Sequence, residues 1–156
     1  IDGYPLTENT AIQIWIANQF PQANLLPKDP LEFVKAVSIM SWCAAGIHPK
    51  LTQQARPERY CDLPESAASV QALGSHSLFE MLEIADSMLA NREWFFDHFT
   101  SADTYFYWCF RRGTQFKPDL SHFTNCMAHM QRIEQRPSVQ KMLAYEKSVI
   151  AQFNKT

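Results

Sequence analysis

Phe99-Thr100-Ser101-Ala102-Asp103 is the stretch that decides how this chain folds. Thr100 and Asp103 have the spacing of a capping box, in which the first and fourth side chains satisfy free backbone N–H groups at the start of a helix. Here Asp stands where Glu or Gln is usual. The pattern predicts a helix that begins at Thr100 and is stopped by Gly113. Losing such a cap lowers the free energy of unfolding by on the order of 1 kcal/mol. We interpret the pair as a folding element, not a catalytic one.

Apolar residues at helical spacing predict further helices on both sides of this one. Thr7 is the expected cap of a first helix that reaches about Asn18. Asp29 followed by Pro30 gives a capping acid and a proline at the first helical position, which is a strong helix start. That helix carries apolar residues nearly all round, so we expect it to be central in the core and to end between Gly46 and Pro49. Later helices are predicted over residues 64–89, 118–136 and from 137 onward.

About six helices and no convincing strand predict an all-α bundle. The 156 residues suggest one domain, and 46% hydrophobic residues exclude disorder as the main state. A formal charge of −2 provides no broad basic field, so we predict no nucleic-acid partner. We interpret Arg56 and Arg59 as residues of a solvated loop.

The sequence also predicts where the protein works. It shows no run of 18 apolar residues and no secretory leader, so we predict no membrane association. The four cysteines form no Cys-x-x-Cys pair and lie far apart in a chain large enough for its own core. A reducing, cytoplasmic setting is the expectation.

Four landmarks in order resemble the glutathione transferase family, and bacterial members most of all. They are Asp2-Gly3 with the segment Leu6-Thr7-Glu8-Asn9-Thr10-Ala11-Ile12, the proline-rich residues 21–30, residues 99–103 and residues 132–140. The resemblance implies that residues 1–20 correspond to the last strand and helix of a thioredoxin-like glutathione-binding domain. Residues 21–30 would be the linker, and residues 31–156 the helical C-terminal domain. The family's catalytic Tyr, Ser or Cys would precede Ile1, so the catalytic residue is unknown.

Glu8-Asn9 matches the family's Glu-Ser pair, which the resemblance implies is the binding site for the γ-glutamyl end of glutathione. A helix start offers free N–H groups and a positive dipole end to a ligand carboxylate. Glu8 supplies the opposite charge for the ligand ammonium, and the Asn9 amide can donate a hydrogen bond. Asn in place of Ser adds bulk. The alternative is that Glu8 only complements the helix dipole.

Aromatic rings and cations on the 100–113 helix have the chemistry of an electrophile-binding wall. Tyr107 and Arg111 share one face by spacing, and Trp108 and Arg112 share another. Most rings on such a helix are expected to pack in the core. The candidate electrophile-site residues are Met40, His48, Tyr107, Trp108 and Arg111.

His48 follows the core helix where some bacterial family members have a His-Lys pair facing the active site. Pro49 breaks that pattern. The favoured alternative is a surface histidine near a helix C-terminus, where the dipole stabilises its charge.

His122, Cys126 and His129 fall on one helix face, which is compatible with metal ligation. On a straight helix they spread over about ten ångströms of axis, too far for one zinc ion. We therefore predict no metal site.

The resemblance implies a glutathione-dependent conjugation or reduction of small hydrophobic electrophiles, with this chain supplying one wall of the site. Glutathione is the expected cosubstrate, and a homodimer around residues 31–89 is the expected assembly. The alternative is a non-catalytic interaction module of translation- or stress-associated proteins, since fold does not decide function.

Overall fold

The computed structural model describes residues 1–116 and 119–153, and over these residues it contains helices and turns but no strand. The all-α prediction is confirmed for this part of the chain. The α-helices are α1 (Asn9–Gln19), α2 (Pro30–Trp42), α3 (His48–Ala55), α4 (Ala67–Met88), α5 (Ser101–Thr114), α6 (Thr124–Glu134) and α7 (Pro137–Phe153). Residues 117–118 and 154–156 lie outside the described residues; of these, 118 and 154–156 belong to predicted helical segments.

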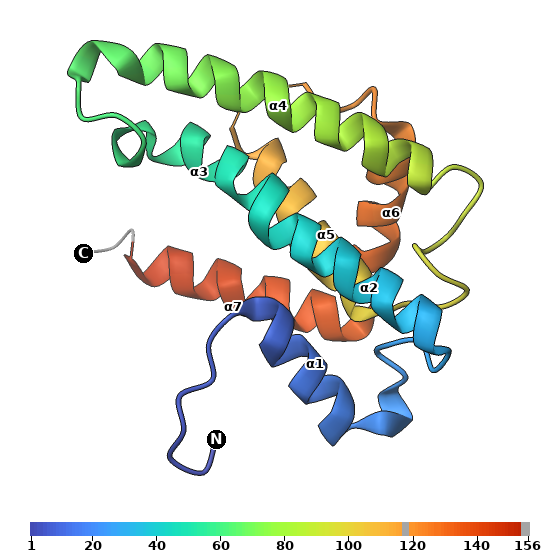
Figure 1. Cartoon of the computed structure of the whole chain (residues 1–156). Helices are drawn as coiled ribbons and strands as arrows, with labels where there is room; N and C mark the ends of the chain where they lie inside the picture. Colours follow the sequence, from blue (N-terminus) through green and yellow to red (C-terminus); the bar gives the residue numbers. More distant parts are fainter. Residues whose placement is uncertain (117–118, 154–156) are drawn as a thin grey trace.

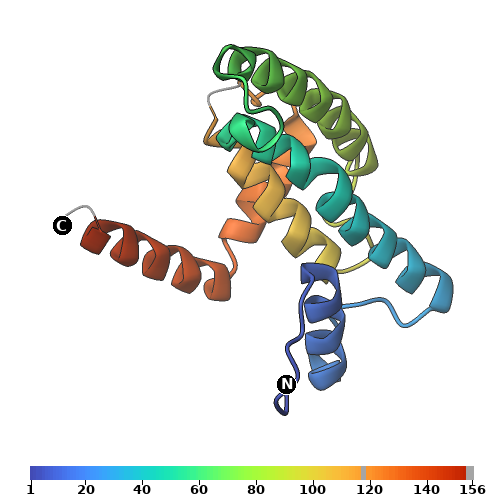
Figure 2. The same cartoon turned by 60° about the vertical axis from the view of Figure 1, so that its left-hand side comes forward.

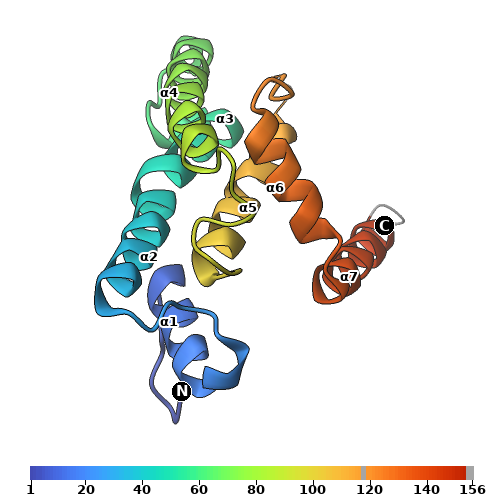
Figure 3. The ribbon, with the colours of Figure 1, turned by 90° about the vertical axis from the view of Figure 1, so that its right-hand side faces the viewer.

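Helix α5 lies at the centre of the bundle, between α2 on one side and α6 on the other (Figures 1 and 3). It buries Phe106 and Phe110 almost completely. The 30–46 segment is therefore not the central helix that its composition predicts. Helix α2 buries one side but leaves Leu31 and Val34 63% and 60% exposed. Helix α7 buries no residue and projects away from the other helices (Figure 2).

The predicted end of the second helix between Gly46 and Pro49 is wrong. The helix continues through a π turn, Cys43–Ile47, into α3. In this turn the His48 N–H donates to the Cys43 carbonyl, five residues back. A proline inside a regular helix removes a hydrogen bond and clashes with the preceding turn. The widened turn changes the bonding pattern just before Pro49, so the chain stays helical past it.

The run from Pro30 to Ala55 is the single described segment that is long and apolar enough, by length and composition, to cross a membrane. The same criteria are met by core helices of globular proteins. Met40 and Ile47 in this run have no exposed surface, and α2 packs against α5. The segment thus packs one face into the core of this bundle.

The capping box predicted at Thr100 and Asp103 is present. One Asp103 oxygen, Oδ2, accepts from the Thr100 N–H at 2.8 Å and from the Thr100 hydroxyl at 2.9 Å. The other, Oδ1, accepts from the Phe95 N–H and lies 3.0 Å from His129 Nε2. All four groups are buried. A single carboxylate therefore joins the start of α5 to the preceding loop and to α6.

The start of one other helix differs from the prediction because its cap is a tertiary contact. Helix α6 begins at Thr124, not near Pro118, which lies outside the described residues. Its first turn is capped from α4, since Asp86 Oδ1 accepts the N–H groups of Asn125 and Cys126 at 2.9 Å.

The N-terminal residues 1–8 form a turn and an extended segment, not the last strand of a sheet. Strand hydrogen bonds need a neighbouring strand, and no described segment supplies one.

Replacing Asp103 by alanine leaves two buried N–H groups and one imidazole without their acceptor. We expect the free energy of unfolding to fall by about 3 kcal/mol or more, compared with about 1 kcal/mol for Thr100→Ala, which removes one partner. Urea denaturation followed by circular dichroism measures both. Asp62→Ala, at an exposed loop residue, is the control and should leave stability unchanged. Equal losses for Asp103→Ala and Asp62→Ala would contradict the role of the buried network.

Candidate functional site

A cavity of about 360 Å³ lies between α1 and the first two turns of α5. Helix α1 contributes Asn9, Gln13 and Ile16. Leu25 of the linker closes one side. From α5 come Ser101, Thr104, Tyr105 and Trp108, which fall at positions i, i+3, i+4 and i+7 of one helix face. Sequence reasoning missed Ser101 and Thr104 as cavity residues, although that spacing was the available signal.

Glu8 stands directly before α1 in an unusual backbone conformation, with φ 68° and ψ 117°. Such a conformation in a non-glycine residue stores about 1–3 kcal/mol of strain, which is typical of functional sites. Thr7 is not the cap that the sequence predicts, and within the described residues no side chain caps α1. Glu8 is exposed, and the next residue, Asn9, lines the cavity. Glu8 therefore lies beside the cavity, next to the first N–H groups of α1.

Asn9, the first residue of α1, reaches across the cavity toward α5. Burial raises the pKa of Tyr105 above its usual value, and a side-chain hydrogen bond from Asn9 opposes that rise. The structure thus places Asn9, which the sequence predicts as a ligand residue, in contact with an α5 tyrosine.

The Trp108 side chain borders three cavities. It is 42% exposed and lines the α1–α5 cavity, a cavity beside α3 and another beside Glu146 of α7. The His48 ring contacts Trp108 edge-on, with 4.7 Å between centroids. Burial lowers the pKa of His48, which favours its neutral form. His48 begins α3, so the helix-end alternative does not describe its position.

Tyr107 and Arg111 share a face, as their spacing predicts, but that face meets α6 and α7. The Tyr107 hydroxyl donates to Glu134 Oε1 at 3.1 Å, and Tyr107 is only 5% exposed. Burial and the neighbouring Glu134 carboxylate raise the pKa of Tyr107 to about 12. Arg111 Nη2 lies 2.8 Å from Glu146 Oε2. Both residues hold helices together on the side away from the α1–α5 cavity.

Met40, another electrophile-site candidate, has no exposed surface. It belongs to the core cluster of buried residues and lines none of the cavities described here. Its contribution in this structure is packing.

The three potential metal ligands of the sequence do not meet. His129 is bonded to Asp103, whereas His122 precedes α6 and stacks on Phe79 with 5.5 Å between ring centroids. Cys126 is buried beside Asp86. Over residues 1–116 and 119–153, no three His, Cys, Asp or Glu side chains converge in a metal-binding group.

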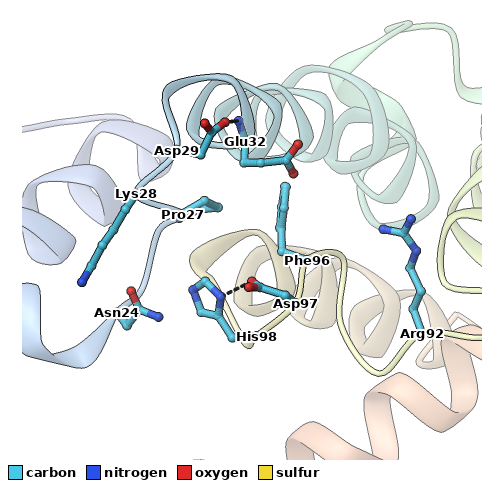
Figure 4. A pocket seen from close by; sticks show the side chains of 9 residues that line it. All are labelled: Asn24, Pro27, Lys28, Asp29, Glu32, Arg92, Phe96, Asp97 and His98. Atoms are coloured by element: carbon cyan, nitrogen blue, oxygen red, sulfur yellow. Dashed lines mark hydrogen bonds and ion pairs between the residues drawn. The ribbon is translucent and has the colours of Figure 1, made fainter.

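A larger cavity, about 530 Å³, lies on another side of the molecule, between the linker, the start of α2 and the loop before α5 (Figure 4). Its three carboxylates are already engaged. Asp29 caps α2, Glu32 pairs with Lys35 at 2.7 Å, and Asp97 contacts His98. Sequence reasoning gave no signal for this cavity, which gathers segments far apart in the chain.

Comparison with known proteins decides the family. The chain is 30% identical over 148 residues to the glutathione S-transferase GstA of Escherichia coli O157:H7, a match that covers 93% of this chain and 70% of that protein. The chain belongs to the glutathione S-transferase family. The resemblance predicted from the four sequence landmarks is thereby confirmed. No protein-family model matches the chain.

Solved glutathione S-transferase structures share the fold. A beta-class enzyme of Sphingomonas chungbukensis is 30% identical, with a TM-score of 0.81, over 93% of this chain and 70% of that one. A sphingomonad glutathione S-transferase complexed with glutathione is 26% identical, with the same TM-score, over 94% and 70% of the two chains. The helical arrangement described above is therefore that of this family.

Asn9→Ala should raise the pKa of Tyr105 further. The hydrogen bond from Asn9 favours the charged phenolate, so its removal leaves the burial that raises this pKa unopposed. The measurement is the pH titration of ¹³C-labelled tyrosine ring signals, assigned with Tyr105→Phe. Gln13→Ala, in the same cavity wall, is the control and should leave the Tyr105 midpoint in place. An unchanged or lower midpoint in Asn9→Ala would rule out the contact.

Proposed function

We propose that this chain forms part of a cytoplasmic glutathione S-transferase that conjugates or reduces small hydrophobic electrophiles with glutathione. The observation that carries the proposal is the strained Glu8 directly before Asn9, which lines the α1–α5 cavity. Family membership and the glutathione complex of the sphingomonad relative support it. The four cysteines are all free thiols, which agrees with a reducing compartment.

The proposed ligand contacts follow from the chemistry of the γ-glutamyl end, which carries a carboxylate and an ammonium. The uncapped first turn of α1 presents N–H groups and the positive end of its dipole to the carboxylate. The Glu8 carboxylate binds the ammonium. The Asn9 amide donates a further hydrogen bond to the ligand, and its side chain also interacts with Tyr105.

The electrophile would occupy the space around Trp108, with His48 and Tyr105 as neighbours. Exposed aromatic faces bind apolar acceptors and exclude water from the reacting atoms. Holding the acceptor against a thiolate in one geometry removes much of the entropic barrier of a bimolecular reaction. The wall residues would thus act by positioning, and no residue of this chain is assigned the activation of the thiol.

The division of the chain is proposed on the same basis. Residues 1–20 would belong to the thioredoxin-like glutathione-binding domain, with residues 21–30 as the linker and residues 31–156 as the helical domain. In support, α1 is joined to α2 by a proline-rich segment that contains a short 3-10 turn, Pro21–Ala23. Helix α1 packs against α2 and α5, and its residues form one side of the α1–α5 cavity.

The non-catalytic docking module is not favoured, because the curated relative and the solved structures with sequence similarity are named glutathione S-transferases. A docking module would not need the strained Glu8 beside a cavity.

Glu8→Gln should weaken glutathione binding by about tenfold to a hundredfold, since it removes the charge from one strong hydrogen bond while keeping the side-chain shape. Isothermal titration of the intact protein with glutathione measures the effect. Glu65→Gln, an equal charge change at an exposed residue far along the chain, is the control and should bind as the wild type does. Wild-type protein that takes up no glutathione at millimolar concentration would refute the proposed function.

A homodimer is the proposed assembly, and its interface would lie on α2 and α4. Leu31 and Val34 of α2 and Leu73 and Ile84 of α4 are each more than half exposed. Exposed apolar side chains on neighbouring helices are typical of protein interfaces. Within one chain these four side chains stay largely exposed to solvent.

Val34→Glu should shift the protein from dimer to monomer, because it places a charge in the proposed apolar interface. Light scattering at several protein concentrations measures the mass. Ile150→Glu, on an exposed position of α7, is the matched control and should leave the mass unchanged. Wild-type protein that is monomeric at high concentration would exclude this interface.

A further inference from the structure

A separate cavity of about 190 Å³ lies beside Trp108, between α3, the 3-10 turn Pro57–Arg59 and α5. Its lining contains three arginines, Arg56, Arg59 and Arg112, and no carboxylate. The apolar part of the lining comes from Leu51 and Ala55. The cavity thus combines positive charge with an apolar floor.

The positive charge of this cavity is not neutralised within the described part of the chain. Arg111, the neighbour of Arg112, is paired with Glu146. In contrast, Arg56, Arg59 and Arg112 form no ion pair with any described residue. The Arg112 guanidinium donates to the Gln115 side-chain oxygen and lies 4.8 Å from the Phe116 ring centroid, which orients it without cancelling its charge. Three arginines without a carboxylate partner at one cavity are unusual in a chain of net charge −2.

The backbone that carries two of these arginines is fixed on α3. The Arg56 N–H donates to the Thr52 carbonyl at 2.8 Å, and the Arg59 N–H donates to the Arg56 carbonyl at 3.1 Å. The Tyr60 hydroxyl donates to the Pro49 carbonyl at 2.8 Å and ties the end of the turn back to the start of α3. Less ordering is therefore needed when a ligand binds.

Trp108 adds a flat aromatic surface to the charged rim. Its ring lines this cavity as well as the α1–α5 cavity, and His48 holds it from one edge at 4.7 Å. A ligand lying on Trp108 would therefore face the arginines at one end and the Glu8 side of the molecule at the other. The planar guanidinium group matches the geometry of a carboxylate better than that of a neutral group.

We propose that this cavity selects acceptor substrates that are aromatic carboxylates, with the ring on Trp108 and the carboxylate facing Arg56, Arg59 and Arg112. The proposal rests on the proposed function, because it names the substrate class of the same site. With 4-chloro-3-nitrobenzoate, the glutathione sulfur attacks the ring carbon that bears chlorine. A C–S bond forms, the C–Cl bond breaks, chloride leaves, and the thiol proton passes to solvent.

The test is a titration of the intact protein with 4-chloro-3-nitrobenzoate and with the uncharged 4-chloro-3-nitrobenzamide, in the absence of glutathione. We expect the carboxylate to bind about tenfold more tightly than the amide. Each of Arg56→Gln, Arg59→Gln and Arg112→Gln should reduce that ratio by about two- to fivefold, as expected for exposed ion pairs. Lys141→Gln removes one positive charge from an exposed position of α7 and is the control. Its ratio should equal that of the wild type.

Equal affinity for the carboxylate and the amide would overturn the proposal, as would an equal loss in Lys141→Gln. Inorganic phosphate that binds as tightly as the carboxylate would overturn the role of the aromatic ring. Because glutathione is absent, these results do not depend on Glu8 or Asn9, so failure here is distinct from failure of the proposed function. In turnover, the kcat/KM preference for the carboxylate should fall in Arg59→Gln while glutathione affinity stays unchanged.

Discussion

The fold depends on one buried carboxylate. Asp103 has no exposed surface, and a charge in that position is stable only when its oxygens are fully hydrogen-bonded. Its partners come from the α5 start, the preceding loop and α6. Ser101, two residues before Asp103 in the same turn, donates its N–H to the Leu25 carbonyl and adds the linker to this junction. The α5 residues that face α1 follow within two turns, so the junction that fixes the helix also fixes the cavity wall.

Local patterns predicted those parts of the fold whose hydrogen bonds are local. Asp29 caps α2 through the N–H groups of Leu31 and Glu32, and Asn91 has the left-handed conformation, φ 59°, that its place after α4 suggests. The start of α6 was misjudged because Asp86, about 40 residues away in the sequence, supplies its cap. A capping residue on another helix leaves no mark in the local sequence.

In the candidate site, too, sequence spacing predicts which residues share a helix face but not which partners they meet. Spacing correctly grouped Tyr107 with Arg111, but only the packing of α6 and α7 determines that this pair meets Glu134 and Glu146. Composition classed Arg56 and Arg59 as solvated loop residues, yet the fold brings them to the same cavity as Arg112. The approach of His48 to Trp108 joins α3 to α5 across some sixty residues of chain. The family resemblance indicated His48, and the aromatic composition of its helix indicated Trp108, but neither predicted that the two rings meet.

The π turn between α2 and α3 has a consequence for the orientation of everything that follows it. One extra residue in a helical turn advances the later side chains by about 100° around the axis relative to an uninterrupted helix. With Cys43–Ile47 wound in this way, Leu51 points into the core while His48 lies against Trp108. The bulge therefore works as a phase adjustment: it sets the angular position at which α3 turns Leu51 toward the core and His48 toward α5.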